Sequence, residues 1–140
     1  MSGRPNKIKP VPVKSDLIVP PPPESLDEIA VVEWHRVSQK LFELGVLSDL
    51  DVSVIAGYCE AWSEFVRLSL MVKKVGPVTK TDKGNWIQHP VLGVKNHAAE
   101  RMLRFAAQLG MTPVAREKLN IKPVESDDSF AKFAGLKVMK

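Results

Sequence analysis

Residues 48–75 read SDLDVSVIAGYCEAWSEFVRLSLMVKKV, and this stretch decides the fold. It opens on a capping box, Ser48-Asp49-Leu50-Asp51, whose acidic side chains also suit the positive end of a helix dipole. Gly76-Pro77 follows it, and a glycine followed by a proline ends a helix. The sequence therefore predicts one long helix that runs to about Val75.

Apolar residues cover most of the circumference of this predicted helix. They form two stripes at helical spacing, which leave only a narrow polar strip. The first stripe is Leu50, Val54, Tyr58, Ala61, Phe65, Leu68 and Val72, the second is Val52, Ile55, Cys59, Trp62, Val66 and Leu70, and the polar strip is Ser53, Glu60, Ser63, Glu64, Arg67 and Lys74. A chain of 140 residues has few elements to cover such a helix, so we predict a homo-oligomer. The predicted interface residues are Tyr58, Trp62, Phe65 and Val66.

Shorter helical signals flank the long helix. A capping box at Ser25-Leu26-Asp27-Glu28 predicts a first helix that ends at Gly45. A third helix is expected from about Val91 to Leu109, and Thr112-Pro113 opens a short helix to about Leu119. The inward residues of the first helix are expected to be Ala30, Trp34, Val37, Leu41 and Leu44, and those of the third Leu92, Ala99, Met102, Leu103, Ala106 and Leu109.

Between Pro77 and Gln88 the pattern changes to two short strands. Residues 78–81 and 86–88 flank the turn Asp82-Lys83-Gly84-Asn85, a glycine-containing connection typical of a β-hairpin. The predicted fold is therefore mainly α, a helical bundle with a long central helix hairpin and a small β-hairpin near residues 78–88. The helical oligomerisation core spans residues 24–120.

A proline-rich segment precedes this core. Seven of the eleven prolines fall within residues 1–23, which end in the run Pro20–Pro23. Proline fixes φ and lacks an amide donor, so residues 1–23 are predicted to form an extended, flexible arm. Its bases would attract phosphates whatever the nucleotide sequence, and they are Arg4, Lys7, Lys9 and Lys14. The alternative is a tail that only aids solubility.

Charge is distributed unevenly along the chain, whose net charge is +4. Residues 1–23 carry +3, residues 24–76 carry −4, residues 77–124 carry +5, and residues 125–140 balance. Two basic zones flanking an acidic one favour a polyanionic partner such as nucleic acid. The bases of the second zone predicted to bind DNA are Lys80, Lys83, Lys95, Arg101 and Arg104. The alternative is a solvated helix face with a Glu100 to Arg104 pair.

The sequence holds no pattern of a catalytic or metal site. A G-x-x-x-x-G-K-[ST] motif is absent, so ATP binding by a P-loop is excluded. His35, His89 and His97 are isolated and are expected at the surface or as helix caps. Cys59, the single cysteine, is expected in the core. We expect a non-enzymatic, intracellular protein without cofactor, metal or membrane segment.

Taken in order, several segments resemble phage terminase small subunits. The resemblance covers roughly residues 3–120, and its most specific part is Leu-Gly-Met-Thr-Pro-x-x-Arg at Leu109–Arg116. The other parts are Gly3-Arg4-Pro5, Pro20–Pro23, Trp34, Leu41 to Gly45, Leu47-Ser48 to Asp51, Tyr58-Cys59 with Trp62, and His89-Pro90 before a basic helix. The tail after Asn120 is not covered.

This resemblance implies a DNA-packaging protein of the host cytoplasm that assembles into a ring. Its implied partners are double-stranded viral DNA and a large terminase subunit carrying ATPase and nuclease, which it would regulate. One departure is that no convincing short helix-turn-helix is present, because the second predicted helix is too long and too apolar to be mainly a groove reader. The alternative function is a DNA-independent helical oligomeric adaptor that docks a partner enzyme.

Residues 121–140 are expected to form a flexible C-terminal tail that binds the large subunit. Phe130, Phe133 and Leu136 recur three residues apart and could form one face of a short helix on that partner. Gly135 disfavours a helix in the free chain, so the segment is predicted to order only when docked.

Overall fold

The computed structural model describes residues 18–121. Its elements, in chain order, are α1 (Glu28–Glu43), the 3-10 turn η1 (Asp49–Asp51), α2 (Val52–Val75), β1 (Val78–Lys80), β2 (Trp86–Gln88), α3 (Pro90–Gln108) and α4 (Pro113–Lys118). The mainly helical fold with one small antiparallel hairpin is as predicted. In this part of the chain no helix is long and apolar enough to cross a membrane.

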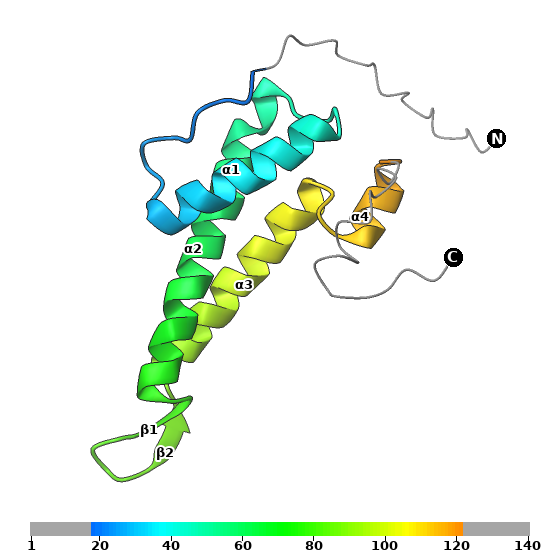
Figure 1. The fold of residues 1–140 in the computed structure, drawn as a ribbon. Coiled ribbons are helices and arrows are strands. Elements are labelled where there is room, and N and C mark those ends of the chain that lie inside the picture. The colour runs from blue at the N-terminus through cyan, green and yellow to red at the C-terminus, as the bar shows by residue number, and fades with distance from the viewer. Residues whose placement is uncertain (1–17, 122–140) are drawn as a thin grey trace, which may run out of the picture.

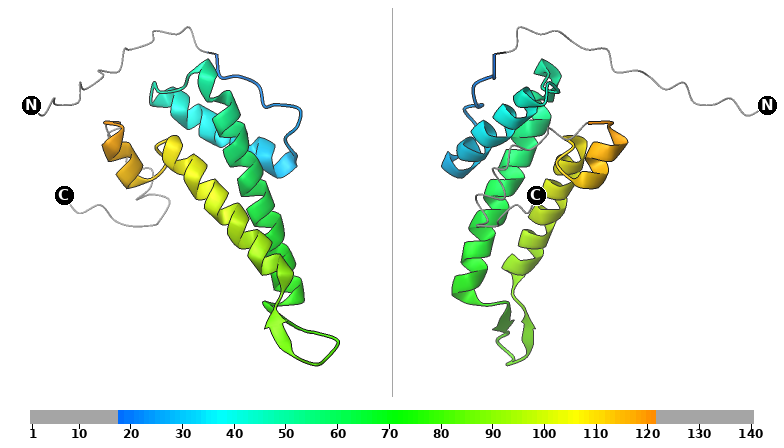
Figure 2. Two further views of the ribbon diagram at one scale, coloured as in Figure 1. Left: turned by 180° about the vertical axis from the view of Figure 1, so that it is seen from behind. Right: turned by 45° about the vertical axis from the view of Figure 1, so that its right-hand side comes forward.

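The long helix α2 is the axis of the molecule (Figure 1). α3 returns antiparallel beside it, and α1 crosses the N-terminal half of α2, as the two views of Figure 2 also show. The hairpin β1–β2 joins the far ends of α2 and α3 and projects away from α1. We call residues 24–68, which include α1 and most of α2, the proximal region. Residues 69–95, which include the end of α2, the hairpin and the start of α3, are the distal region.

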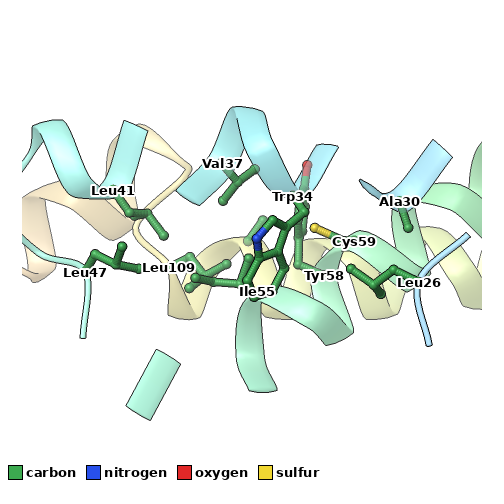
Figure 3. Close-up of a cluster of buried hydrophobic side chains, with 11 residues drawn as sticks. Leu26, Ala30, Trp34, Val37, Leu41, Leu47, Ile55, Tyr58, Cys59 and Leu109 are labelled. Carbon is green, nitrogen blue, oxygen red and sulfur yellow. The ribbon is translucent and has the colours of Figure 1, made fainter. Parts of the chain in front are cut away.

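The hydrophobic core lies in the proximal region, where α1 crosses α2 and the end of α3 (Figure 3). Trp34 of α1 is at its centre with 0% of its surface exposed. The surrounding buried residues are Leu26, Ala30, Val37, Leu41, Leu47, Ile55, Tyr58, Cys59, Ala106 and Leu109. Burial raises the pKa of the Cys59 thiol to about 12, so this thiol is protonated at neutral pH. The predicted core role of Cys59 is thereby confirmed.

Residues 18–23, the last part of the predicted arm, lie against this core. The indole Nε1–H of Trp34 donates a hydrogen bond to the carbonyl oxygen of Pro20 at 3.1 Å. A buried indole needs such an acceptor, and proline, which lacks a donor, still offers its carbonyl. The folded unit therefore begins before residue 24, and residues 1–17 lie outside the described part of the chain.

The start of α1 differs from the prediction. Asp27, not Ser25, is the N-cap, and its carboxylate accepts a hydrogen bond from the backbone N–H of Ala30 at 2.9 Å. The prediction of a capping box at Ser25 is wrong. The N–H of Leu26 donates a hydrogen bond to the carbonyl of Pro23, and this bond closes a turn. The turn buries Leu26 before the helix starts.

The other predicted boundaries are confirmed. Gly45, with φ of 68°, follows α1 in the left-handed conformation that glycine favours. The Ser48 capping box is present and begins the η1 turn, which continues into α2. Thr112 caps α4, and His89 caps α3 by accepting the N–H of Val91 on Nδ1 at 3.2 Å. The capping role expected for a histidine is therefore seen at His89.

Three side chains face differently from the prediction. Leu103, expected inward on α3, is 57% exposed, and Ala98 is fully buried instead. The reason is rotation of α3, which turns Ala98 and Phe105 toward α2 and brings the Phe105 ring against Gly57. Ser63, expected on the polar strip of α2, is buried because its hydroxyl bonds to the carboxylate of Asp27 at 2.7 Å.

Candidate nucleic-acid interface and oligomer surface

The five described bases that were predicted to bind DNA do not form one patch. Lys80 and Lys83 belong to the β-hairpin and its turn, whereas the other three lie on α3. On a helix that turns about 100° per residue, the separation of nine positions from Lys95 to Arg104 places these two on opposite sides of α3. The structure thus splits the second basic zone into a hairpin pair and two separate faces of α3.

Three of these five bases contact partners within the chain. The Lys80 ammonium lies 4.8 Å from the centroid of the Trp86 ring, and the Lys95 ammonium lies 5.5 Å from the centroid of Phe65. Both are cation–π contacts. Arg101 forms an ion pair with Glu64 of α2. Lys95 and Arg101 therefore also hold α3 to α2.

Lys83 and Arg104 are the most available of these five bases. Both are exposed, and within residues 18–121 neither side chain makes a hydrogen bond or an ion pair. Oε2 of Glu100 lies 3.8 Å from Nδ1 of His97. The Glu100 to Arg104 ion pair, which was the alternative interpretation of these charges, is not formed. These two side chains can reach phosphates without breaking a contact inside the chain.

Of the four predicted oligomer-interface residues, three are half-buried in the chain and the fourth, Tyr58, is buried. Trp62, Phe65 and Val66 are each partly covered, and the ring centroids of the first two are 6.3 Å apart. Tyr58 is buried in the core and donates its hydroxyl to Glu33 at 2.9 Å. Burial, with the nearby Glu33, raises the pKa of Tyr58 far above its usual value of 10.0. Tyr58 offers no surface to a second copy, so the prediction is corrected at this residue.

Glu33 belongs to a buried polar network that the sequence analysis did not find. Its carboxylate accepts hydrogen bonds from Tyr58 and from Nε of Arg36, the latter at 2.8 Å. The Glu33 carboxylate in turn raises the pKa of Arg36. Because its polar groups satisfy one another, the network is a structural element of the core. Within residues 18–121, no group of three or more His, Cys, Asp or Glu side chains could hold a metal ion.

The distal region carries several exposed apolar side chains, of which only Leu70 belongs to the apolar stripes described from the sequence. They lie at the end of α2, on the hairpin and at the start of α3, and they are Leu70, Met71, Val75, Val78, Trp86, Ile87 and Val94. The sequence did contain a signal of this exposure, because a lone two-stranded hairpin has no second layer to cover its faces. Exposed apolar side chains gathered at one end of a molecule are typical of a partner surface.

A family model described as the phage terminase small subunit matches residues 30–126, which is more than half of the chain and runs from the first turn of α1 through α4. The chain belongs to the phage terminase small subunit family. The match starts after Gly3-Arg4-Pro5 and Pro20–Pro23, and it ends six residues beyond Asn120. No curated protein and no solved structure matches the chain. Members of this small subunit family are generally not catalytic.

Seven predicted site residues of this small subunit lie outside the described residues. They are the arm bases Arg4, Lys7, Lys9 and Lys14 and the tail residues Phe130, Phe133 and Leu136.

Proposed function

We propose that this terminase small subunit assembles into a ring, binds double-stranded viral DNA and regulates the large terminase subunit during genome packaging in the host cytoplasm. The observation that carries the proposal is the family match over residues 30–126. In this role the protein is not an enzyme and needs no cofactor.

DNA binding is expected to rest mainly on phosphate contacts. Lys83 and Arg104 are the first candidates because their charges are exposed and engaged by no other described residue. Lys80, Lys95 and Arg101 rank below them because each already has a partner in the chain. The remaining contacts are assigned to the arm bases Arg4, Lys7, Lys9 and Lys14.

Binding of a labelled viral DNA duplex over a range of salt concentrations tests this part of the proposal. The logarithm of the binding constant should fall linearly with the logarithm of salt concentration, with a slope of about 0.9 per phosphate contact. Lys83→Ala/Arg104→Ala should flatten the slope by about 1.8, and replacement of the four arm bases by up to about 3.6. Lys118→Ala, which removes one exposed base of α4, is the control and should leave the slope unchanged. Absence of salt-dependent binding by the parent chain would overturn the DNA assignment.

Regulation of the large subunit is assigned to the tail that contains Phe130, Phe133 and Leu136. Deletion of residues 125–140 should leave the oligomer mass and the DNA affinity unchanged and remove stimulation of the large subunit's ATPase. If the deletion instead abolishes assembly, the tail belongs to the fold and the docking assignment is withdrawn.

The second candidate function is a DNA-independent oligomeric adaptor. One observation favours it, namely that three of the five described bases are engaged within the chain. An assembled protein that shows no salt-dependent affinity for duplex DNA but still binds the large subunit would select this function over the first.

A further inference from the structure

We propose that the β-hairpin of one copy docks into an acidic hollow between the start of α1 and the middle of α2 of a second copy. The proposal rests on the self-assembly proposed above and names the two surfaces that meet. In this contact the distal region provides the docking element and the proximal region provides the receptor.

The hairpin has the properties of a docking element. Its register pairs Lys80 with Trp86 and Val78 with Gln88, so these four side chains share one face of the two-stranded sheet. Trp86 on this face is 67% exposed, and Val78 is exposed beside it. An isolated hairpin is at best marginally stable in water, so a partner that covers this face would stabilise it.

Charge identifies the partner as a second copy. The distal region, residues 69–95, contains five bases and one acid, whereas the proximal region, residues 24–68, contains three bases and nine acids. The net charges of the two regions are therefore +4 and −6, so each is complementary to the other. DNA would meet the positive charge but not the apolar face, because nucleic-acid interfaces are more polar than protein interfaces.

The receptor is a shallow hollow between the start of α1 and the middle of α2. Its lining residues are Ser25, Asp27, Glu60, Glu64, Arg67 and Leu68. Asp27 and Glu64 already pair with Arg67 and Arg101, respectively. Glu60 is exposed and has no ion-pair partner within residues 18–121, so its charge is open to a lysine from outside. Leu68 provides an apolar contact for an aromatic ring.

The hairpin cannot reach the hollow of its own chain. Eleven residues of the straight helix α2 separate Glu64 from Val75, a length of about 16 Å, and the hairpin continues away from the hollow (Figure 1). Each copy therefore presents a hairpin to one neighbour and a hollow to another. Such a head-to-tail contact closes into a ring when its rotation allows.

The test uses charge exchange, with mass measured by light scattering over a range of protein concentrations in the absence of DNA. Lys80→Glu gives the Trp86 face of the hairpin the charge of the hollow, and Glu60→Lys gives the hollow the charge of the hairpin. Lys83, which lies in the turn and is assigned to DNA, is left unchanged. Each variant alone should need at least about tenfold more protein to assemble. An equal mixture should recover assembly, since the acidic hairpin of one variant then meets the basic hollow of the other. Lys118→Glu on α4 is the charge control and should assemble like the parent chain.

Trp86→Ala tests the apolar part of the contact without changing charge. It should also weaken assembly at least about tenfold while the unfolding midpoint at low concentration stays unchanged, because Trp86 is exposed in the single chain. Variants that assemble like the parent chain, or a mixture that does not recover, would overturn the proposal and leave self-assembly intact. A parent chain that stays monomeric would refute the self-assembly itself. If Trp86→Ala weakens DNA binding but not assembly, the Trp86 face of the hairpin contacts DNA and the proposal is likewise overturned.

Discussion

The proximal and distal parts of the long helix α2 differ in how their surfaces are covered. In the proximal region α1 and α3 both pack on it, and polar side chains such as Ser63 and Glu33 have partners. In the distal region α3 is the only described helix that packs on α2, and apolar side chains such as Leu70, Met71 and Val75 are exposed. The proximal part of this largely apolar helix is thus covered by other elements of its own chain, and the distal part leaves apolar side chains exposed for a partner to cover.

The largest predicted effect is a difference in the free energy of unfolding between alanine variants of two tryptophans, one from each region. Trp34→Ala removes a fully buried ring at the centre of the core and should lower the free energy of unfolding by about 3–5 kcal/mol. Trp86→Ala removes an exposed ring and should change the unfolding of the single chain by less than about 0.5 kcal/mol. Urea denaturation of both variants at low protein concentration measures the contrast. Equal losses would show that the distal region contributes to the fold as much as the core does.

A second prediction concerns the close approach of α2 and α3. A Cβ added at Gly57 would lie 2.6 Å from Cζ of Phe105, so Gly57→Ala should lower the free energy of unfolding by about 1–3 kcal/mol. Gly93→Ala on α3 is the matched control, because a Cβ there meets nothing within 4 Å, and it should stabilise the helix by up to about 1 kcal/mol. Gly57→Ala combined with Phe105→Leu should regain part of the loss. A neutral Gly57→Ala would mean that the Phe105 ring turns away, or that the two helices move apart, without cost.

Much of the fold could be predicted because its signals are local. Caps such as Ser48 and Thr112, and the terminating Gly45, fix helix ends through backbone groups a few residues away. The burial of Ser63 and the fixing of Pro20 depend on Asp27 and Trp34, which lie 36 and 14 residues away in sequence. No local pattern contains such contacts.

The candidate site was harder to predict than the fold for the same reason. Charge along the sequence located a basic zone, but it gave no sign that Lys95 would lie over Phe65 or that Arg101 would pair with Glu64. The apolar stripes indicated an interface, but Tyr58 belongs to the core because Glu33 from α1 accepts its hydroxyl. Side chains that share a stripe in sequence are divided between core and surface by what packs on them.

The smallest predicted effect concerns Asp27, which joins α1 to the middle of α2. The Ser63 hydroxyl, the Ala30 N–H and Arg67 hold its pKa below the usual 3.8, although burial opposes them. A folded-state pKa below the unfolded value stabilises the fold above about pH 4, and this contribution is lost as pH falls through the folded-state pKa. It should amount to less than about 1 kcal/mol because 40% of the Asp27 side chain is exposed to solvent.

Ser63→Ala isolates this contribution, since it removes the largest cause of the lowered pKa. The parent chain should lose slightly more stability than Ser63→Ala between about pH 4 and pH 2 in urea denaturation, because other carboxylates titrate alike in both. Identical pH profiles would show that Asp27 is not tied to α2 in solution.

Amide hydrogen exchange at low and high protein concentration tests most directly whether the distal region is the partner surface. The proximal core around Trp34 and Ile55 should be protected at both concentrations, because it is covered within one chain. Added protection at high concentration should fall on residues 70–95, with the hollow around Ser25 and Glu60 as its counterpart. Protection gained instead on α4, or on the exposed side of α1 at Val32, with residues 70–95 unchanged, would contradict the account.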